Sequence, residues 1–421
     1  MNKITAILCL LAAGMATTAS AQEGAVPKGV PHLDHVWVIV MENHGFGQVI
    51  GNANMPFTNK YAQKVNSGRN YFAVGHPSLT NYLEIVGGSN FGIRDDNSPD
   101  WHNSTCTPNL ATGSVSLEST STPICPIYGT GTDAATPAID FSNETTGPPG
   151  DIDVDGTVGF AANTKTVGKT IADELVAAGL TWKSYQESLP PTGADRVNNA
   201  DGFYSNLTPV GTLLPSSGFT NADVVALYAV KHNPFAYFQS VQGGSNPELS
   251  LSRMADFEGT GSLFADLSSG HVPAFSFIAP NQCNDQHGRG NAGPVCAFDT
   301  TDNGTLTGLN PGAMYRGDQT IQTLVTAIHE SSAWREGQNA IVVVWDENDY
   351  SVSPTTNQVL LTVDTNYGGK GVQSNKFYTH FSLLKSLEAG FGLPCLNHAC
   401  DAGTKVMSDL FASGEGHDDG N

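Results

Sequence analysis

The stretch VWVIVMENHGFG, residues 36–47, decides the fold. Mostly apolar residues fill positions 36–41 and run directly into Glu42, Asn43 and His44. The apolar residues do not alternate with polar ones, which predicts a strand that is covered on both faces, as in a parallel sheet. A carboxylate, an amide and an imidazole at the end of a buried strand indicate a polar site at the edge of that sheet.

Two further apolar, β-branched runs predict strands of the same kind, AFSFIA at 274–279 and AIVVVW at 340–345. Apolar residues recur at helical spacing in three other segments, 166–182, 318–334 and 380–392, and in the first of them the pattern stops at Gly179. Strands that alternate with helices predict an α/β fold with a mostly parallel central sheet and helices on both of its faces.

The amino terminus has the pattern of a secretory signal peptide. A single Lys3 precedes an apolar stretch and a small-residue exit, Ala19-Ser20-Ala21, so we expect residues 1–21 to be removed by cleavage after Ala21. The apolar stretch is too short to span a bilayer. The sequence therefore predicts a secreted or periplasmic protein without stable membrane insertion.

The rest of the chain predicts a single domain at 22–412, followed by a flexible tail at 413–421. Residues 95–165 differ from their surroundings, because they are rich in Ser, Thr, Gly, Pro and Asn and show little periodicity. We interpret them as a loop-rich insertion or a lid over a site.

Cysteine usage agrees with export. One of the 7 cysteines, Cys9, lies in the signal peptide, and the other 6 stand in close pairs. These pairs are Cys106/Cys125, Cys283/Cys296 and Cys395/Cys400. An even count in an exported chain predicts three disulfides, although the spacing does not fix the pairing. A structural zinc site is the alternative, and the lack of paired CxxC motifs disfavours it.

The chain is strongly acidic. It has 19 Lys and Arg against 40 Asp and Glu, a net charge of −21. Removal of Lys3 with the signal peptide gives 18 − 40 = −22. Such a chain repels a polyphosphate backbone, which argues against nucleic-acid binding.

Acidic and amide residues stand directly after the predicted strands. Glu42 and Asn43 follow the first strand, and Asp346 and Glu347 follow the strand at 340–345. Ligands in open α/β sheets bind at the carboxyl ends of the strands. Carboxylates brought together there repel one another unless a cation lies between them, so the four residues predict a site for a hard divalent metal ion of unknown identity. The alternative is that they are ordinary turn or cap residues.

A nucleophile is predicted in GHPSLTNYLEIVGGS, residues 75–89. Ser78 stands at the amino end of an apparent helix, where free N–H groups favour an anion, and a nearby metal would lower the pKa of its hydroxyl. The alternative is that Ser78 only caps the helix. Thr80 is a second possible hydroxyl, and the amide of Asn81 could contact an oxyanion.

The strand at 274–279 is followed by Asn281, Asp285 and His287. His380 begins the predicted helix at 380–392. Of the 12 histidines, His287 and His380 have the positions expected for a group that protonates a leaving group or binds a phosphoryl oxygen.

These motifs resemble a known family. The chain is similar to the phosphoesterases that include bacterial and fungal acid phosphatases and phospholipase C enzymes, within the alkaline-phosphatase-like superfamily. Seven segments between residues 36 and 393 carry the resemblance in family order: VIVMENHGFGQVIGN, GHPSLTNYLEIVGG, TIADELVAAGLTWKSYQES, KHNPFAYF, FSFIAPNQCNDQHG, VVVWDENDY and YTHFSLLKSLEAGFGL.

The resemblance implies an alkaline-phosphatase-like fold and a role for each matching residue. The implied metal ligands are Glu42, Asn43, Ser78, Asp346 and Glu347. The implied substrate-binding residues are Asn81, Asn43 and Asp285. The implied catalytic residues are the nucleophile Ser78 with His287 and His380. Gly288 stands where the family commonly has an Asp, so we expect the ring of His287 to lack that carboxylate partner.

The function that follows is a secreted, metal-dependent phosphomonoesterase of the acid-phosphatase type. It would hydrolyse small phosphate esters through a phosphoserine intermediate. Two alternatives stay open, a phospholipase C that acts on lipid head groups and a phosphate-ester binding protein without turnover. The natural substrate, the number of metal ions and the oligomeric state are not determined by the sequence.

Overall fold

The computed structural model of the protein describes most of the chain downstream of the predicted signal peptide. The described residues are 23–93, 95–99, 126–127, 166–190, 193, 197–198, 227–288, 311–349 and 357–411. The predicted signal peptide, most of the insertion at 95–165 and the tail at 413–421 lie outside them. The division of the chain into these parts therefore stays a prediction.

An eight-stranded sheet forms the centre of the described molecule. Its strand order is β5-β4-β6-β1-β7-β8-β2-β9. The strands are β1 (His35–Met41), β2 (Asn66–Gly68), β4 (Trp182–Gln186), β5 (Met254–Ala255), β6 (Phe275–Ala279), β7 (Asn339–Trp345), β8 (Leu361–Thr365) and β9 (Gln373–Ser374). Only the β7–β8 and β8–β2 pairs are antiparallel. The predicted α/β fold with a mostly parallel sheet is confirmed.

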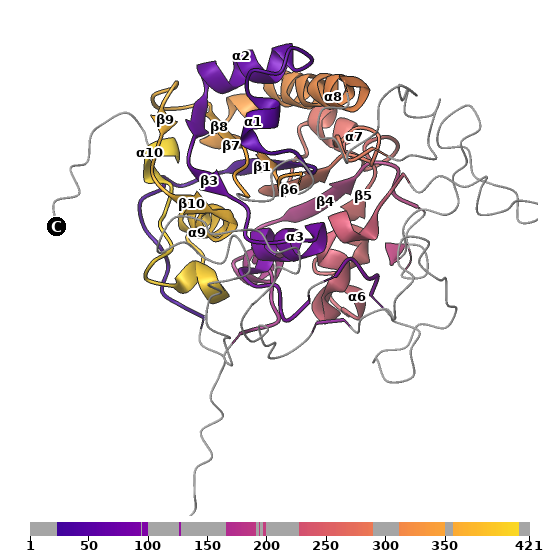
Figure 1. Ribbon diagram of the computed structural model, residues 1–421. Coiled ribbons are helices and arrows are strands. Elements are labelled where there is room, and N and C mark those ends of the chain that lie inside the picture. The colour runs from indigo at the N-terminus through magenta and orange to yellow at the C-terminus, as the bar shows by residue number, and fades with distance from the viewer. Residues whose placement is uncertain are drawn as a thin grey trace, which may run out of the picture.

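Helices cover both faces of this sheet (Figure 1). On one face α2 (Pro56–Lys64) and α7 (Leu263–Ser269) pack against α8 (Pro311–Glu330). On the other face α3 (Ser78–Gly87), α4 (Ile171–Ala177) and α9 (His380–Phe391) pack together. This double cover explains why the runs in β1, β6 and β7 are apolar without alternation, because their side chains are buried on both sides.

The remaining elements are short. They are the helices α1 (Phe46–Val49), α6 (Gln239–Gln242) and α10 (Ser408–Phe411), and the 3₁₀ turns η2 (Val230–His232), η3 (Pro234–Tyr237), η4 (Leu251–Arg253), η7 (Ala333–Arg335) and η8 (Asn397–Cys400). A small second sheet pairs β3 (Tyr71–Phe72) with β10 (Tyr378–Thr379) in parallel. This second sheet links the start of α9 to the segment that leads into α3.

The helical pattern in the segment 166–182 was predicted to stop at Gly179, and the helix ends just before that residue. The segment 166–182 forms α4 only over Ile171–Ala177, and its last residue, Trp182, already begins β4. The helix starts at Thr170, whose hydroxyl accepts from the N–H of Ala172, and Gly179 follows it with a φ of 77°. A left-handed glycine ends a helix, so the apolar residues beyond it continue as a strand. The predictions at 318–334 and 380–392 correspond to α8 and α9.

One of the predicted disulfides lies within the described residues. Cys395 is bonded to Cys400, with 5.2 Å between their Cα atoms. Cys106, Cys125 and Cys296 lie outside the described residues, so the other two pairings stay predictions. No helix in the described part of the chain combines the length and apolar character needed to cross a bilayer.

Candidate active site

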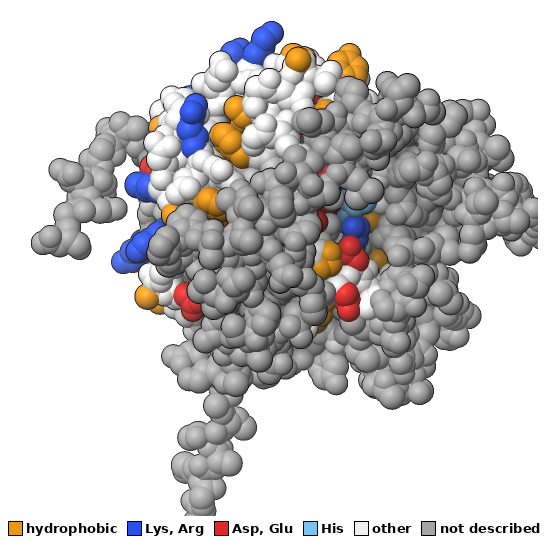
Figure 2. Space-filling model, in the orientation of Figure 1, with side chains coloured by type: hydrophobic (Ala, Val, Ile, Leu, Met, Phe, Trp, Pro, Cys, Tyr) orange, Lys and Arg blue, Asp and Glu red, His pale blue; other side chains and the backbone are white. Residues whose placement is uncertain are grey.

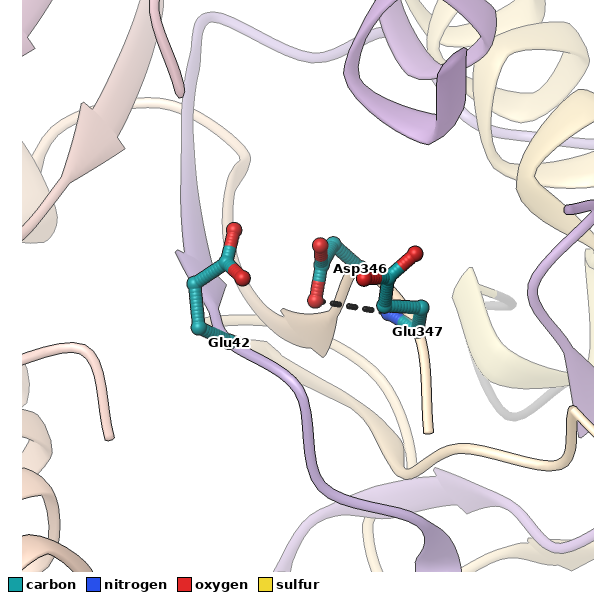
Figure 3. A group of neighbouring side chains, drawn as sticks. All are labelled: Glu42, Asp346 and Glu347. Carbon is teal, nitrogen blue, oxygen red and sulfur yellow. Dashed lines mark hydrogen bonds between the residues drawn. The ribbon is translucent and has the colours of Figure 1, made fainter. Parts of the chain in front are cut away.

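Three buried carboxylates meet where β1 and β7 end (Figure 3). These parallel strands are neighbours in register, with Met41 opposite Trp345, so the residues that follow them emerge side by side. Glu42, Asp346 and Glu347 each place a carboxylate oxygen within 4.8 Å of the others. The arrangement follows from the pairing of the two most central strands, and the sequence predicted that these carboxylates meet at one edge of the sheet.

The backbone at this edge binds one carboxylate oxygen of Asp346 and leaves the other without a hydrogen bond. Asn43 has a φ of 56°, and its N–H donates to Asp346 Oδ1 at 3.0 Å. The N–H of Glu347 donates to the same oxygen at 2.7 Å. The second oxygen, Asp346 Oδ2, is buried and has no hydrogen-bond partner among the described residues. An unpaired buried carboxylate oxygen is costly unless a cation or a donor meets it.

The electrostatics of the cluster also call for a cation. Burial, together with Glu42 and Glu347, raises the pKa of Asp346 well above its usual value. Burial raises the pKa of Glu347 as well. Closely spaced carboxylates of this kind form a donor set that suits a hard divalent ion, which would favour their charged forms. The described residues therefore fit the metal that the sequence implied.

Ser78 lies at the centre of the cluster. It is the first residue of α3, follows the cis His76–Pro77 bond, and is 2% exposed. Its hydroxyl donates to Glu347 Oε1 at 3.0 Å and lies 3.2 Å from Glu42 Oε2. The structure thus brings Ser78 together with the three carboxylates. Asn43 takes part through its backbone N–H, and a metal bond from its side chain stays a prediction.

The amide of Asn81 holds the loop before Ser78. Its Oδ1 accepts from the N–H groups of Val74 and Gly75, at 3.0 and 3.1 Å. Its Nδ2 donates to the Gly75 carbonyl at 2.7 Å and to Glu347 Oε2 at 3.1 Å. These four bonds occupy the whole amide group. Contact between Asn81 and a phosphate, which the resemblance implied, stays a prediction.

His380 supports the backbone of Asp346. Its Nε2 lies 2.6 Å from the Asp346 carbonyl oxygen, and its Nδ1 lies 2.9 Å from the Tyr71 hydroxyl. The ring is fully buried, and this burial lowers its pKa to about 4. Both ring nitrogens are taken by these contacts. In this arrangement His380 positions a metal-site residue, and the catalytic role that we predicted for it has no direct contact to support it.

Asp285 reaches the site through a histidine that the sequence analysis did not single out. His232 places Nε2 2.9 Å from Glu42 Oε1 and Nδ1 3.4 Å from Asp285 Oδ2. Its ring stacks on Tyr82, with centroids 5.0 Å apart. Burial opposes charge on this ring, but Glu42 and Asp285 together raise the pKa of His232 to about 9. Burial raises the pKa of Asp285 to about 7.

His287 is held by its own loop. Its N–H donates to Asp285 Oδ1 at 2.7 Å, and its ring Nδ1 donates to the Gly288 carbonyl at 2.9 Å. As expected from Gly288, the ring has no carboxylate partner at this position, and the backbone carbonyl of Gly288 orients it instead. Burial and the nearby Lys231 lower the pKa of His287 to about 3.

Lys231 is a second residue that the sequence analysis missed. Its Nζ lies 3.5 Å from Ser78 Oγ, 3.5 Å from His287 Nε2 and 3.1 Å from Asp96 Oδ2. Lys231 and His232 stand together in KHNPFAYF. A charged pair that opens an otherwise apolar, aromatic segment was the signal that could have identified both residues.

The other two histidines near the motifs also contact the site. His76 lies 2.9 Å from Glu347 Oε2 through Nδ1, and 2.9 Å from Asn348 Oδ1 through Nε2. His44 is buried, and its Nδ1 lies 3.0 Å from the Glu42 carbonyl oxygen. Both therefore help to hold the carboxylates in place.

Comparison with known proteins agrees with this geometry. Residues 52–295 match the model of the phosphoesterase family, and they include Ser78, Lys231 and His287. The chain belongs to the phosphoesterase family. Glu42, Asp346 and Glu347 lie outside the matched range, so the assignment of these carboxylates rests on the geometry of the sheet edge.

The curated relatives are phosphatases. An acid phosphatase of Aspergillus fumigatus is 25% identical over 80% of this chain and 51% of its own length. A phosphatidylinositol-3-phosphatase of Mycobacterium tuberculosis is 23% identical over 94% of this chain and 91% of its own length. A probable acid phosphatase of Kluyveromyces lactis is 24% identical over 92% of this chain and 64% of its own length. The chain thus spans about half the length of the Aspergillus relative.

Among solved structures, the chain resembles a protein of the alkaline phosphatase superfamily from Vibrio parahaemolyticus. The two are 12% identical, with a TM-score of 0.42 over 90% of this chain and 72% of the other. A phosphonate monoester hydrolase of Agrobacterium radiobacter is also similar, at 12% identity and a TM-score of 0.42 over 91% of this chain and 78% of the other.

Proposed function

We propose that the protein is an exported, metal-dependent phosphomonoesterase of the acid-phosphatase type. The observation that carries this proposal is the position of Ser78, whose hydroxyl lies between Glu42 and Glu347 in a buried acidic cluster. Membership of the phosphoesterase family and the names of the curated relatives support the same reaction class.

The acidic cluster would hold the metal through Glu42, Asp346 and Glu347. A divalent cation bound there would polarise a phosphoryl oxygen and favour ionisation of the serine hydroxyl. The carboxylates that accept from Ser78 also set the direction of its hydroxyl. The site thus has a nucleophile whose oxygen is fixed before the substrate arrives, which lowers the entropic cost of attack.

The chemical step follows from Ser78. Its hydroxyl loses its proton as Oγ attacks phosphorus, the bond from phosphorus to the departing alcohol oxygen breaks, and that oxygen takes up a proton by way of solvent. The ammonium of Lys231, 3.5 Å from Oγ, can stabilise the phosphoryl oxygens as their charge redistributes. Water then attacks the phosphoserine, the Oγ–P bond breaks, and phosphate leaves.

The hydrogen bonds of His287 favour a role in this second step. Because Nδ1 donates to the Gly288 carbonyl, the neutral ring presents the lone pair of Nε2 to the side of Lys231 and Ser78. A lone pair there can accept a proton from the attacking water. We propose this base role in place of the assistance to alcohol departure that the sequence suggested.

A second candidate substrate class is a phosphomonoester on an inositol head group. The Mycobacterium phosphatidylinositol-3-phosphatase matches over 91% of its own length, whereas the Aspergillus acid phosphatase matches over 51%. This candidate uses the same phosphomonoester reaction and differs only in what the phosphate is attached to.

The test compares p-nitrophenyl phosphate with p-nitrophenylphosphorylcholine, using protein with and without EDTA treatment. We expect faster hydrolysis of the monoester and loss of turnover in EDTA that a divalent ion restores. Phosphate release from vesicles that contain phosphatidylinositol 3-phosphate tests the second substrate class. Faster hydrolysis of the phosphorylcholine diester would overturn the proposal in favour of a phospholipase C.

Substitution of the nucleophile tests the mechanism. We expect Ser78→Ala to lower kcat by at least about 10⁴-fold, as in other enzymes that lose their nucleophile. Thr80→Val is the matched control, because the Thr80 hydroxyl donates to the Pro77 carbonyl, outside the acidic cluster. Full activity of the Ser78→Ala protein would exclude Ser78 as the nucleophile.

A further inference from the structure

A cavity lies between α2, α8 and β8, at the other end of the sheet from Ser78. Its volume is about 410 Å³, which is within the usual range of small-molecule pockets. The lining residues are Phe57, Lys60, Tyr61, Lys64, Val65, Val325, Thr326, His329, Asp364 and Lys370. None of these residues belongs to the acidic cluster or to its neighbours described above.

The strand register gives the distance between the cavity and the acidic cluster. Asp364 pairs with Ile341 near the start of β7, whereas Asp346 follows the end of that strand. Five residues of extended strand span about 16 Å. The cavity is therefore a separate site and not an extension of the catalytic centre.

One wall of the cavity is lined by a stacked aromatic pair. Phe57 and Tyr61 lie one turn apart on α2, and their rings stack with centroids 5.5 Å apart and an angle of 16° between their planes. Val65 and Val325 continue the apolar surface from α2 and α8. This aromatic and apolar lining favours a flat apolar group, which can pack against the rings or their edges.

The carboxylate in the cavity is already neutralised. Asp364 accepts from Lys370 at 2.7 Å, while its other oxygen lies 2.9 Å from His329 Nε2 and 3.3 Å from the Tyr61 hydroxyl. Its side chain is 2% exposed, so it lies beneath these partners. The carboxylate therefore offers little negative charge to a ligand in the cavity.

Two lysines remain at the rim. Lys60 and Lys64 lie one turn apart on α2, both are exposed, and within the described ranges neither has a carboxylate oxygen within 4 Å. Figure 2 shows Lys and Arg side chains over α2. On a chain with a net charge of −21, two ammonium groups beside an aromatic wall form a local attraction for an anion.

We propose that this cavity binds a small organic anion in which a flat, apolar body carries a phosphate, sulfonate or carboxylate group. The body lies against Phe57 and Tyr61, and the anionic group meets Lys60 and Lys64. Both parts are needed, because an inorganic ion leaves the aromatic wall uncovered and a neutral ring leaves the ammonium groups without a partner. The site binds this ligand without converting it and is independent of the proposed phosphatase activity.

The test is calorimetric titration of the full protein with 2-naphthalenesulfonate, which has no ester bond to hydrolyse. We expect saturable binding that Lys60→Ala/Lys64→Ala weakens at least tenfold. Thr326→Trp, a substitution at an exposed lining position, should block the cavity and weaken binding as strongly. Lys376→Ala/Lys405→Ala removes the same charge at exposed positions elsewhere and should leave the affinity unchanged.

Two further titrations separate the parts of the proposal. Inorganic phosphate and 2-naphthol should each bind at least tenfold more weakly than the sulfonate. The proposal is overturned by absence of sulfonate binding in the millimolar range, by equal weakening in the two lysine double variants, or by unchanged affinity after Thr326→Trp. Ser78→Ala should bind the sulfonate like the unchanged protein, so loss of phosphatase activity does not affect the outcome.

Discussion

Asp364 on β8 and Asp346, directly after β7, are both buried aspartates, but their surroundings are opposite. Asp364 contacts Lys370 and His329, and although burial acts in the other direction, these partners lower its pKa. Asp346 has two carboxylates as neighbours and a raised pKa. The comparison teaches that this chain supplies the counter-charge for a buried carboxylate at one end of the sheet. At the other end no described Lys, Arg or His side chain forms an ion pair with Asp346, and we propose that a metal ion supplies the counter-charge.

The largest expected difference between the two aspartates is the loss of kcat on substitution by asparagine. Asp346→Asn removes the charge of a proposed metal ligand, while its remaining oxygen can still accept from the N–H groups of Asn43 and Glu347. We expect kcat to fall about 10³-fold, a loss of roughly 4 kcal/mol of transition-state stabilisation. Asp364→Asn should change kcat less than about threefold, because it alters a site about 16 Å away. Equal losses of p-nitrophenyl phosphate turnover in both variants would break the comparison.

Metal binding should stabilise the protein only through the acidic end. A ligand at about 100 times its Kd adds about 2.7 kcal/mol to the free energy of unfolding. We expect a divalent ion to raise the melting temperature of the unchanged protein and of Asp364→Asn by several degrees, and to leave Asp346→Asn nearly unchanged. Thermal melts over a series of divalent ions measure this effect and also identify the preferred metal. An equal shift in both variants would show that the ion binds elsewhere.

In metal-free protein, Asp364→Asn and Asp346→Asn should change the free energy of unfolding in opposite directions. Asp364→Asn loses charge-assisted hydrogen bonds and should lower the free energy of unfolding by about 2 kcal/mol. Asp346→Asn removes a repelling charge from the acidic cluster and should raise the free energy of unfolding by about 1 kcal/mol. Urea unfolding in EDTA at neutral pH measures both values. Destabilisation by Asp346→Asn would mean that the cluster is already neutralised without a metal.

Acid should reduce the contribution of Asp364 to the free energy of unfolding. Its pKa is lower in the folded protein than the value of 3.8 that is usual for an unfolded chain. Its ionised form therefore adds stability that is fully present above about pH 5 and is lost as the pH falls through the folded pKa. The difference in unfolding free energy between the unchanged protein and Asp364→Asn should shrink below about pH 4. A constant difference would contradict the lowered pKa.

The sequence predicted the parts of the site that depend on strand ends. Unbroken apolar runs identify the buried strands, and the carboxyl ends of parallel strands meet at one edge of the sheet. The sequence alone therefore places Glu42, Asp346 and Glu347 together. Ser78 could be placed at a helix start for a similar reason, because a Gly-His-Pro turn precedes an apolar helical pattern.

The sequence did not reveal which contacts the neighbouring side chains make. His232 sits in a 3₁₀ turn, which has no periodic signature, and it reaches Glu42 from a distant part of the chain. The resemblance implied a catalytic role for His380, but the Tyr71 hydroxyl and the Asp346 carbonyl occupy its ring. The end of α4 was predictable, since Gly179 interrupts the apolar helical pattern and turns the backbone with a φ of 77°.

The register between β1 and β7 has a consequence for biosynthesis. Met41 and Trp345 face each other across this pair, although most of the chain separates them in sequence. Glu42 therefore meets Asp346 and Glu347 only after both have been translated and β7 has paired with β1. We expect that a nascent chain cannot capture its metal stepwise as it emerges, so that metal acquisition follows the last stage of folding.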